Sequence, residues 1–167
     1  MLFSINEEDK TASVIDRISK TKDVLIPRSV KYQDRDFIVT SIRKHAFSND
    51  RFLKTIRFSP DSEVRFIGDS AFQHSKIKNI EIPKSVCELN NSLCNGTPEL
   101  TRVTVDPANK CYKNDEKNPN LILGKSDKKV TILMFLYLQV EIFLMLQFHQ
   151  VLKKLRNAHL MEQKLHI

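Results

Sequence analysis

The feature that most constrains the fold of this chain is an internal repeat of apolar positions. Six apolar columns recur in register over three consecutive units, and the first column advances by 25 and then by 22 residues. The columns hold Ile42, Ala46, Phe47, Leu53, Ile56 and Phe58, then Ile67, Ala71, Phe72, Ile77, Ile80 and Ile82, then Leu89, Leu93, Cys94, Leu100, Val103 and Val105. A unit of this size cannot bury an apolar face alone, so the repeat predicts stacked units that cover one another.

Each unit ends in a segment where apolar and polar residues alternate. Ile56 and Phe58 fall on one side and Thr55 and Arg57 on the other, which is typical of a strand with one buried side. We expect strands near 53–58, 77–82 and 100–105, paired in one short parallel sheet, with short helical or turn segments on the convex side. The residues expected to be buried are Ile56, Phe58, Ala71, Phe72, Ile80, Ile82 and Val103.

A partial copy precedes the three units. Residues 24–30 match 80–86 at the same internal spacing, and Pro27 and Pro83 follow the strand in each copy. Proline cannot donate to a strand ladder, so it marks the end of each strand. The additional residues after the first copy predict a small hairpin that turns at Gln33–Asp36.

Both flanks predict hairpins that close the ends of the stack. Segments 2–5 and 11–15 form one pair, and segments 121–123 and 130–133 form the other, after a polar loop at 106–120. Caps are needed because an open end exposes core and strand edges. The expected domains are an N-terminal hairpin cap (1–23), repeats (24–105), a loop with a C-terminal hairpin (106–133) and a tail of atypical composition (134–167).

The repeats resemble the BspA-like leucine-rich repeats, whose unit is roughly L-x-x-I-x-I-P-x-S-V-x-x-I-G-x-x-A-F. Residues 77–86 match the first half of this unit and 67–72 the second, and 26–42 look like the start of the array in protist members. The resemblance covers about residues 1–133, and the third unit departs from it with Leu93-Cys94 in place of Ala-Phe. It implies a curved leucine-rich-repeat solenoid that recognises proteins without catalysis, like surface antigens and adhesins.

Composition and charge exclude several function classes. Lys+Arg 27 against Asp+Glu 20 gives a net charge of +7, but the charges are interspersed, so we expect no nucleic-acid partner. Three glycines are too few for Gly-rich phosphate loops, and the five histidines lack metal-ligand spacing. We therefore expect no enzyme, no cofactor, no metal and no small-molecule substrate.

The cysteines and the N-terminus give less direct information. Cys94 lies in a core column, which predicts a buried and inert thiol. Cys87 and Cys111 lie near strand ends, and the sequence leaves open whether they form a disulfide. No secretory signal follows Met1, so the default location is cytoplasmic, and the cell surface is suggested only by the family resemblance.

The predicted binding surface is the side of the strands opposite the core. Its residues are Thr55, Arg57, Asn79, Glu81, Arg102 and Thr104. Among them, Arg57 and Arg102 belong to a residue type, arginine, that is common at interaction hot spots. We expect a protein partner bound through this surface. The alternatives are a truncated or frameshifted member without function, and an uncharacterised enzyme or ligand-binding protein.

The tail after Leu133 does not continue the repeat, and three interpretations remain open. Val130–Phe148 is long enough for a transmembrane helix, although Glu141 near its centre is costly. A soluble helix over about 140–165 could instead cover the open end of the stack. The third interpretation is a reading-frame error, because a shifted frame over 149–162 permits SSVKKIEKCAFNG, another unit of the family. It predicts an inserted or deleted base between about codons 133 and 149 of the gene, which resequencing would detect.

Overall fold

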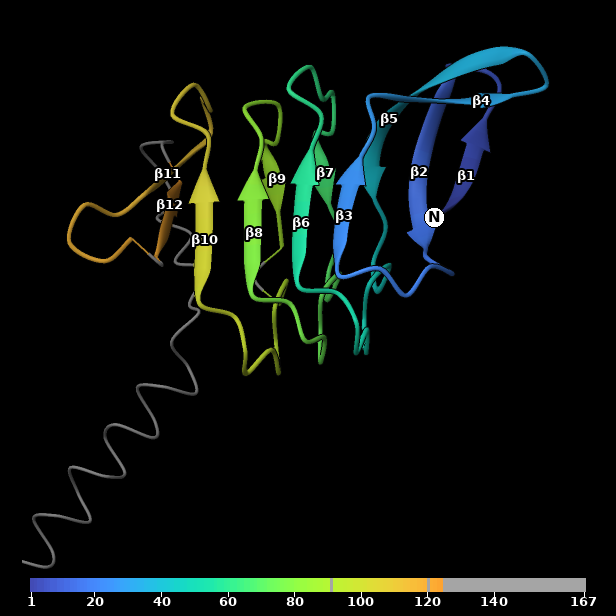
Figure 1. Ribbon diagram of the computed structural model, residues 1–167. Coiled ribbons are helices and arrows are strands. Elements are labelled where there is room, and N and C mark those ends of the chain that lie inside the picture. Colours follow the sequence, from blue (N-terminus) through green and yellow to red (C-terminus); the bar gives the residue numbers. More distant parts are fainter. Residues whose placement is uncertain (91, 120, 125–167) are drawn as a thin grey trace, which may run out of the picture. The chain divides into compact units, whose positions relative to one another are not determined.

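The computed structural model describes residues 1–90, 92–119 and 121–124. In these residues the chain forms twelve strands and no helix. They build a solenoid whose core lies between two sheets. We call these the front sheet and the rear sheet, and Figure 1 shows the front sheet nearest the viewer.

The front sheet has one strand from each repeat unit. Its strands, in spatial order, are β10 (Arg102–Val105), β8 (Asn79–Ile82), β6 (Thr55–Phe58) and β3 (Asp23–Ile26). All three pairings are parallel, so the prediction of one parallel sheet is confirmed, and the partial copy supplies β3 (Figure 1). β3 and β8 end directly before Pro27 and Pro83, as expected.

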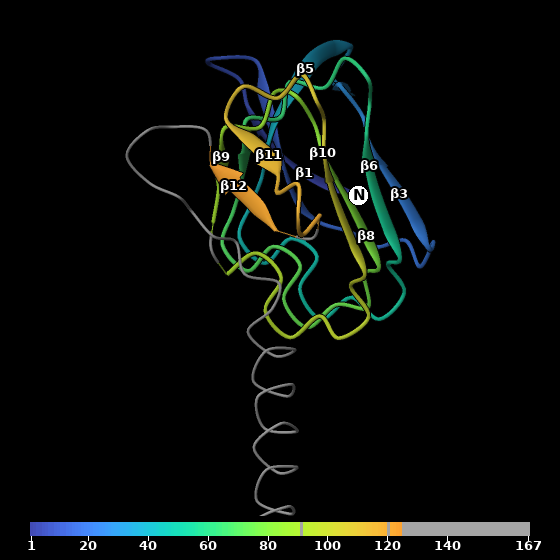
Figure 2. The same cartoon turned by 90° about the vertical axis from the view of Figure 1, so that its left-hand side faces the viewer.

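The rear sheet joins the N-terminal hairpins to the repeats. Its order is β1 (Leu2–Asn6), β2 (Thr11–Asp16), β5 (Arg35–Ile42), β7 (Phe66–Ile67) and β9 (Glu88–Leu89), with β4 (Ser29–Tyr32) paired to β5. The hairpins β1–β2 and β4–β5 are antiparallel, which confirms both predictions, and the remaining pairs are parallel. In Figure 2, which looks along the stack, the front strands and β9 lie on opposite sides.

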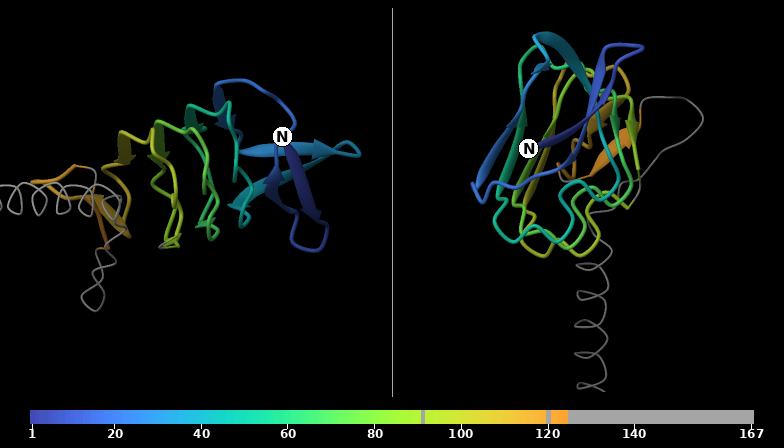
Figure 3. Two further views of the ribbon diagram at one scale, coloured as in Figure 1. Left: turned by 90° about the horizontal axis from the view of Figure 1, so that it is seen from below. Right: turned by 90° about the vertical axis from the view of Figure 1, so that its right-hand side faces the viewer.

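The segments expected to form helical turns form a short rear strand followed by a turn. Positive φ angles of 61° at His45 and 52° at the equivalent Ser70 interrupt these turns, and a helical turn requires negative φ at successive residues. The turns stack through the backbone, because Phe47 N donates to Ala71 O at 2.8 Å and Phe72 N to Leu93 O at 3.0 Å. The stacked coils are visible from below in Figure 3. The prediction of helical segments is therefore wrong, whereas the prediction of turns is correct.

The glycine of the second unit allows these coils to approach one another. A Cβ atom at Gly68 would collide with the backbone of Arg43 and Lys44 in the preceding unit. Gly68 N also donates to Ile42 O at 2.9 Å. Close packing of neighbouring units at this point therefore requires glycine.

The core follows the apolar columns. All seven residues predicted to be buried are buried, including Phe72, which is fully covered. Phe47 and Phe72 occupy the same column in consecutive units, and their rings stack with centroids 5.5 Å apart. Cys94 continues this column and is half-buried, so the third unit lacks the aromatic contact there.

The front strands begin two residues later than predicted, because each unit starts with an irregular hydrogen-bond pattern. Lys54 N and Thr55 N both donate to Lys22 O, at 2.7 and 3.1 Å, and Lys78 N and Asn79 N both donate to Lys54 O at the same two distances. The next unit repeats the arrangement. Two consecutive side chains, such as those of Lys54 and Thr55, therefore stay outside the core, as in a β-bulge, and regular pairing begins at the second of them.

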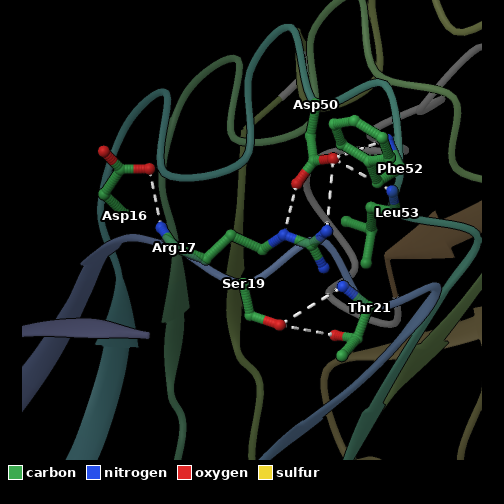
Figure 4. A network of polar contacts seen from close by, with 7 residues as sticks. All are labelled: Asp16, Arg17, Ser19, Thr21, Asp50, Phe52 and Leu53. Atoms are coloured by element: carbon green, nitrogen blue, oxygen red, sulfur yellow. Dashed lines mark hydrogen bonds and ion pairs between the residues drawn. The ribbon is translucent and has the colours of Figure 1, made fainter.

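A buried ion pair fastens the linker after β2 to the first unit. Arg17 Nε lies 2.6 Å from Asp50 Oδ2, and the two side chains are 3% and 10% exposed. Asp50 Oδ1 also accepts hydrogen bonds from the backbone N–H groups of Phe52 and Leu53, both at 2.9 Å (Figure 4). One carboxylate thus holds both the linker and the segment that leads into β6.

The C-terminal end of the solenoid differs from the prediction. β12 (Ile122–Gly124) pairs antiparallel with β11 (Tyr112–Asn114), inside the segment that was expected to be a polar loop. A strand near 121–123 is therefore confirmed, whereas its expected partner at 130–133 lies outside the described residues. The strand at 112–114 was missed because its sequence is polar, and its position depends on contacts made by side-chain amides.

Three side chains of this segment satisfy backbone groups of the last repeat unit, two of them at the exposed edges of the sheets. Asn114 Oδ1 accepts from Val105 N and Asn114 Nδ2 donates to Val103 O, both at 2.9 Å, which covers the edge of β10. On the other side the hydroxyl of Tyr112 accepts from Leu89 N at 3.0 Å. The third is the buried Asn109, whose amide donates to the carbonyl oxygens of two residues in the preceding unit. Polar side chains thus act as the cap that the end of a solenoid needs.

A disulfide between Cys87 and Cys111 joins this cap to the last rear strand, with the Cα atoms 5.1 Å apart. It resolves the question that the sequence left open. Residues 130–133, the candidate membrane span 130–148 and the tail 134–167 lie outside the described residues. In the described part of the chain, no helix has the length and apolarity of a membrane span.

Candidate protein-recognition face

The outer side of the front sheet carries two straight rows of side chains, and we call this surface the front face. Parallel pairing in register aligns Asp23, Thr55, Asn79 and Arg102 in one row. The same register places Leu25 beside Arg57 and Glu81 beside Thr104, and these four form the second row. Each strand contributes one residue to each row, so consecutive units build one continuous surface.

All six residues predicted to bind lie on this face. The burial pattern along β6 is half-buried Thr55, buried Ile56, exposed Arg57 and buried Phe58, and β8 and β10 alternate in the same way. Each of the three strands supplies two of these residues, two positions apart. They share one face because the side chains at alternate positions of a strand point into the core. That they bind a partner remains a prediction.

Charge on the front face is distributed unevenly. Arg57 and Glu81 are neighbours, with Nε and Oε1 3.7 Å apart and both side chains more than half exposed, so this pair contributes little to stability. Arg102 forms no ion pair with any residue that the structure describes. Leu25 is 59% exposed and gives the second row an apolar end. The face therefore offers one unpaired guanidinium and one exposed apolar side chain.

A hollow of about 480 Å³ lies where the front face meets the C-terminal cap. Its lining includes Asn79, Arg102 and Thr104 from the front face, and Asn114 and Pro119 from the cap. The cap thus forms a wall beside β10, so the otherwise flat face ends in a concave site. Arg102 lines this site, and the sequence could not predict its second wall.

Sequence reasoning missed one set of residues that borders the front face. Lys22, Lys54 and Lys78 each immediately precede a front strand, and the irregular pairing described above keeps all three outside the core. The signal was present in the sequence, because lysine occupies the same position in three consecutive copies. Alternation alone assigns this position to the interior side, which is why it was overlooked.

The remaining chemical groups do not form a reactive site in the described residues. A hollow of about 300 Å³ lies beside the linker and includes Arg17 and Asp50, but Asp50 is already occupied by the guanidinium and two backbone N–H groups. Burial of the thiol raises the pKa of Cys94, as expected for an inert thiol, whereas the residue as a whole is half-buried and not fully buried as predicted. No group of acidic, histidine and cysteine side chains suited to a metal ion occurs in the part of the chain that the structure describes.

Comparison with known proteins identifies the repeats. Residues 19–121 match the family model of the BspA type leucine rich repeat region, in six copies. This match covers more than half of the chain. The chain belongs to this family. The resemblance deduced from the Pro-Ser-Val and Ala-Phe elements is thereby confirmed, and repeats of this type are protein-interaction modules.

Three solved structures of bacterial proteins match the chain. The pneumococcal vaccine antigen PcpA matches with a TM-score of 0.52 and 24% identity, over 62% of this chain and 23% of that one. A leucine-rich repeat protein from Bacteroides capillosus matches with a TM-score of 0.41 and 21% identity, over 62% and 92% of the two chains. A leucine rich cell surface protein from Faecalibacterium prausnitzii gives a TM-score of 0.32 and 13% identity, over 75% and 56%. The first match supports the leucine-rich-repeat fold, and no curated protein matches the chain.

Proposed function

We propose that this chain is a non-catalytic recognition module that binds a protein through its front face. The observation that carries the proposal is the pair of in-register rows, which end in a hollow lined by Arg102. Stacked repeats present extended surfaces of this kind, and arginine is enriched among the residues that dominate binding energy. The rest of the face supplies polar groups that can hydrogen-bond a partner.

We further propose a role of the surface-antigen or adhesin type. The pneumococcal protein of similar fold is described as a vaccine antigen. The Cys87–Cys111 disulfide supports exposure to an oxidising environment, because such bonds are rare in reducing compartments. The chain covers 23% of the length of that antigen, so the proposal concerns this module and not a whole surface protein.

The test compares two arginines on the front face with two on the rear of the solenoid. The immobilised chain would first be used to isolate a binding protein from cell-surface extracts, and the affinity of that purified protein would then be measured by surface plasmon resonance. Arg57→Ala with Arg102→Ala should weaken binding by at least about tenfold, which corresponds to about 1.4 kcal/mol. Arg43→Ala with Arg65→Ala removes the same charge beside the rear sheet and should leave the affinity nearly unchanged. Equal effects of the two double variants would exclude the front face as the binding surface.

A further inference from the structure

The front face is bordered by a row of lysines that follows from the irregular start of each unit. We call Lys22, Lys54 and Lys78 the lysine row. Each precedes the first residue of a front strand, and the backbone of each unit is bonded to the next at this position, with Lys54 N to Lys22 O and Lys78 N to Lys54 O both at 2.7 Å. Neighbouring strands in a sheet lie about 4.8 Å apart, so the row places three ammonium-bearing side chains on consecutive rungs. The row runs along the N-terminal ends of the strands, at the lower edge of the front sheet in Figure 1.

One carboxylate of the chain itself already lies in this row. Glu99 Oε2 is 2.7 Å from Lys54 Nζ and 3.8 Å from Lys78 Nζ, and Glu99 Oε1 is 3.8 Å from Lys76 Nζ. The hydrogen bond from Lys54 lowers the pKa of Glu99, so this side chain is ionised at neutral pH. Two lysines of the row and Lys76 therefore share a single carboxylate, and Lys22 forms no ion pair with any residue that the structure describes. The geometry is suited to carboxylates, and the local charge stays positive.

The positive charge continues onto the front face. Thr101 occupies the position equivalent to Lys78 in the next unit, and Arg102 follows it on β10 at the hollow. Asp23, beside Lys22, lies at the opposite edge of the sheet. The positive region thus extends from the lysine row toward the hollow, and Glu99 lies beside Lys54 and Lys78.

We propose that the lysine row binds a carboxylate-rich segment of the protein partner, with Glu99 occupying part of the site until the partner displaces it. This inference rests on the proposed function, because the row borders the front face and would engage the same partner. A carboxylate partner is favoured because the group that these ammonium ions already bind in the chain is itself a carboxylate, that of Glu99, 2.7 Å from Lys54 Nζ. Single-stranded nucleic acid would require aromatic stacking platforms, and Phe52, the exposed aromatic side chain nearby, already lies against Lys20.

The test uses a fluorescein-labelled oligoglutamate peptide and the full chain, with binding followed by anisotropy at low and physiological ionic strength. Replacing the three lysines of the row by glutamine should weaken binding at least about tenfold at low ionic strength, because charge complementarity acts over this range. The matched control replaces Lys110, Lys113 and Lys117 of the C-terminal cap, which removes the same charge at exposed positions away from the row. This control should change the affinity by no more than about twofold, because distant exposed charges are screened.

A second variant predicts a change of opposite sign. Glu99→Gln removes the internal carboxylate and should strengthen oligoglutamate binding about threefold or more. Each variant would first be shown to give the circular dichroism spectrum of the parent chain. If lysine-row and cap variants weaken binding equally, or if Glu99→Gln does not strengthen it, the inference is wrong.

The choice of partner chemistry is tested with two further probes, a heparin fragment and an oligothymidylate. Binding of either that depends on the lysine row, without row-dependent binding of oligoglutamate, would overturn the proposed carboxylate specificity. The front-face experiment with Arg57 and Arg102 is separate. One outcome is that the Arg57 and Arg102 variants abolish binding of the protein partner while the lysine-row variant changes the binding of neither the partner nor oligoglutamate. In that case the proposed function holds and the inference fails.

Discussion

The stacked turns beneath the two sheets form a packed core, and replacing Phe72 by alanine tests this directly. Phe72 is fully buried, and its ring stacks on Phe47 with centroids 5.5 Å apart and planes 16° apart. Its backbone N–H donates to Leu93 O in the following unit, so the neighbouring coils cannot move together freely to refill the space. The substitution therefore creates a cavity between consecutive units.

The expected loss of stability is about 3–5 kcal/mol. Burial of a phenylalanine side chain contributes about 1.5–3 kcal/mol, and loss of the aromatic pair removes a further 0.5–1.5 kcal/mol or so. The remainder comes from the cavity, which rigid neighbouring coils leave open. Domains are stable by only about 5–15 kcal/mol, so this one change removes a large share of the total.

The assay is urea unfolding followed by circular dichroism, with Phe66→Ala as the matched control. Phe66 is the same residue type in the same unit but is 40% exposed on the rear sheet, so its replacement should cost less than about 1 kcal/mol. The difference between the two midpoints isolates burial from residue type. Equal urea midpoints for the two variants would show that the stacked turns containing Phe47 and Phe72 do not form a packed core.

Further predictions concern the two ends of the solenoid, all measured by urea unfolding. Replacing Cys87 and Cys111 by serine should destabilise the chain by about 3 kcal/mol, because the disulfide closes a loop with a sequence separation of 24; no loss relative to the oxidised parent would contradict the pairing. Asp50→Ala should cost about 3–5 kcal/mol by leaving Arg17 buried without its charge partner, and adding Arg17→Met should restore much of this; failure of the second change to help would contradict a charge effect. Asn114→Ala should cost about 1–3 kcal/mol, because the edge of β10 loses two hydrogen bonds, whereas a neutral result would show that water replaces them.

The sequence by itself determined the front sheet and the core. Apolar residues alternate with polar ones inside a repeat of about two dozen residues. These apolar residues are buried when each unit adds a strand beside the strand of the preceding unit. This is why the columns containing Ile56, Ile80 and Val103 lie in one parallel sheet and are buried as predicted. It also explains why the six outward residues of the candidate face were found without a structure.

The tertiary structure alone decided the rear sheet and the residue at which each front strand begins. β7 and β9 have two residues each, too few to produce an alternating pattern, and they exist because neighbouring coils supply the pairing partner. The late start of the front strands depends on one carbonyl that accepts two N–H groups from the next unit. Such a contact joins residues far apart in sequence, and local propensity contains no information about it.

The cap and the recognition surface show the same division. Asn114 and Tyr112 gave no sign of a strand, because they are placed by hydrogen bonds to β10 and β9, which are distant in sequence. The hollow at Arg102 needs the cap as its second wall, and the lysine row needs three units stacked in register. Sequence period determines which residues share a column, whereas the spacing, walls and charge environment of a surface arise from contacts between units, which only the folded chain makes.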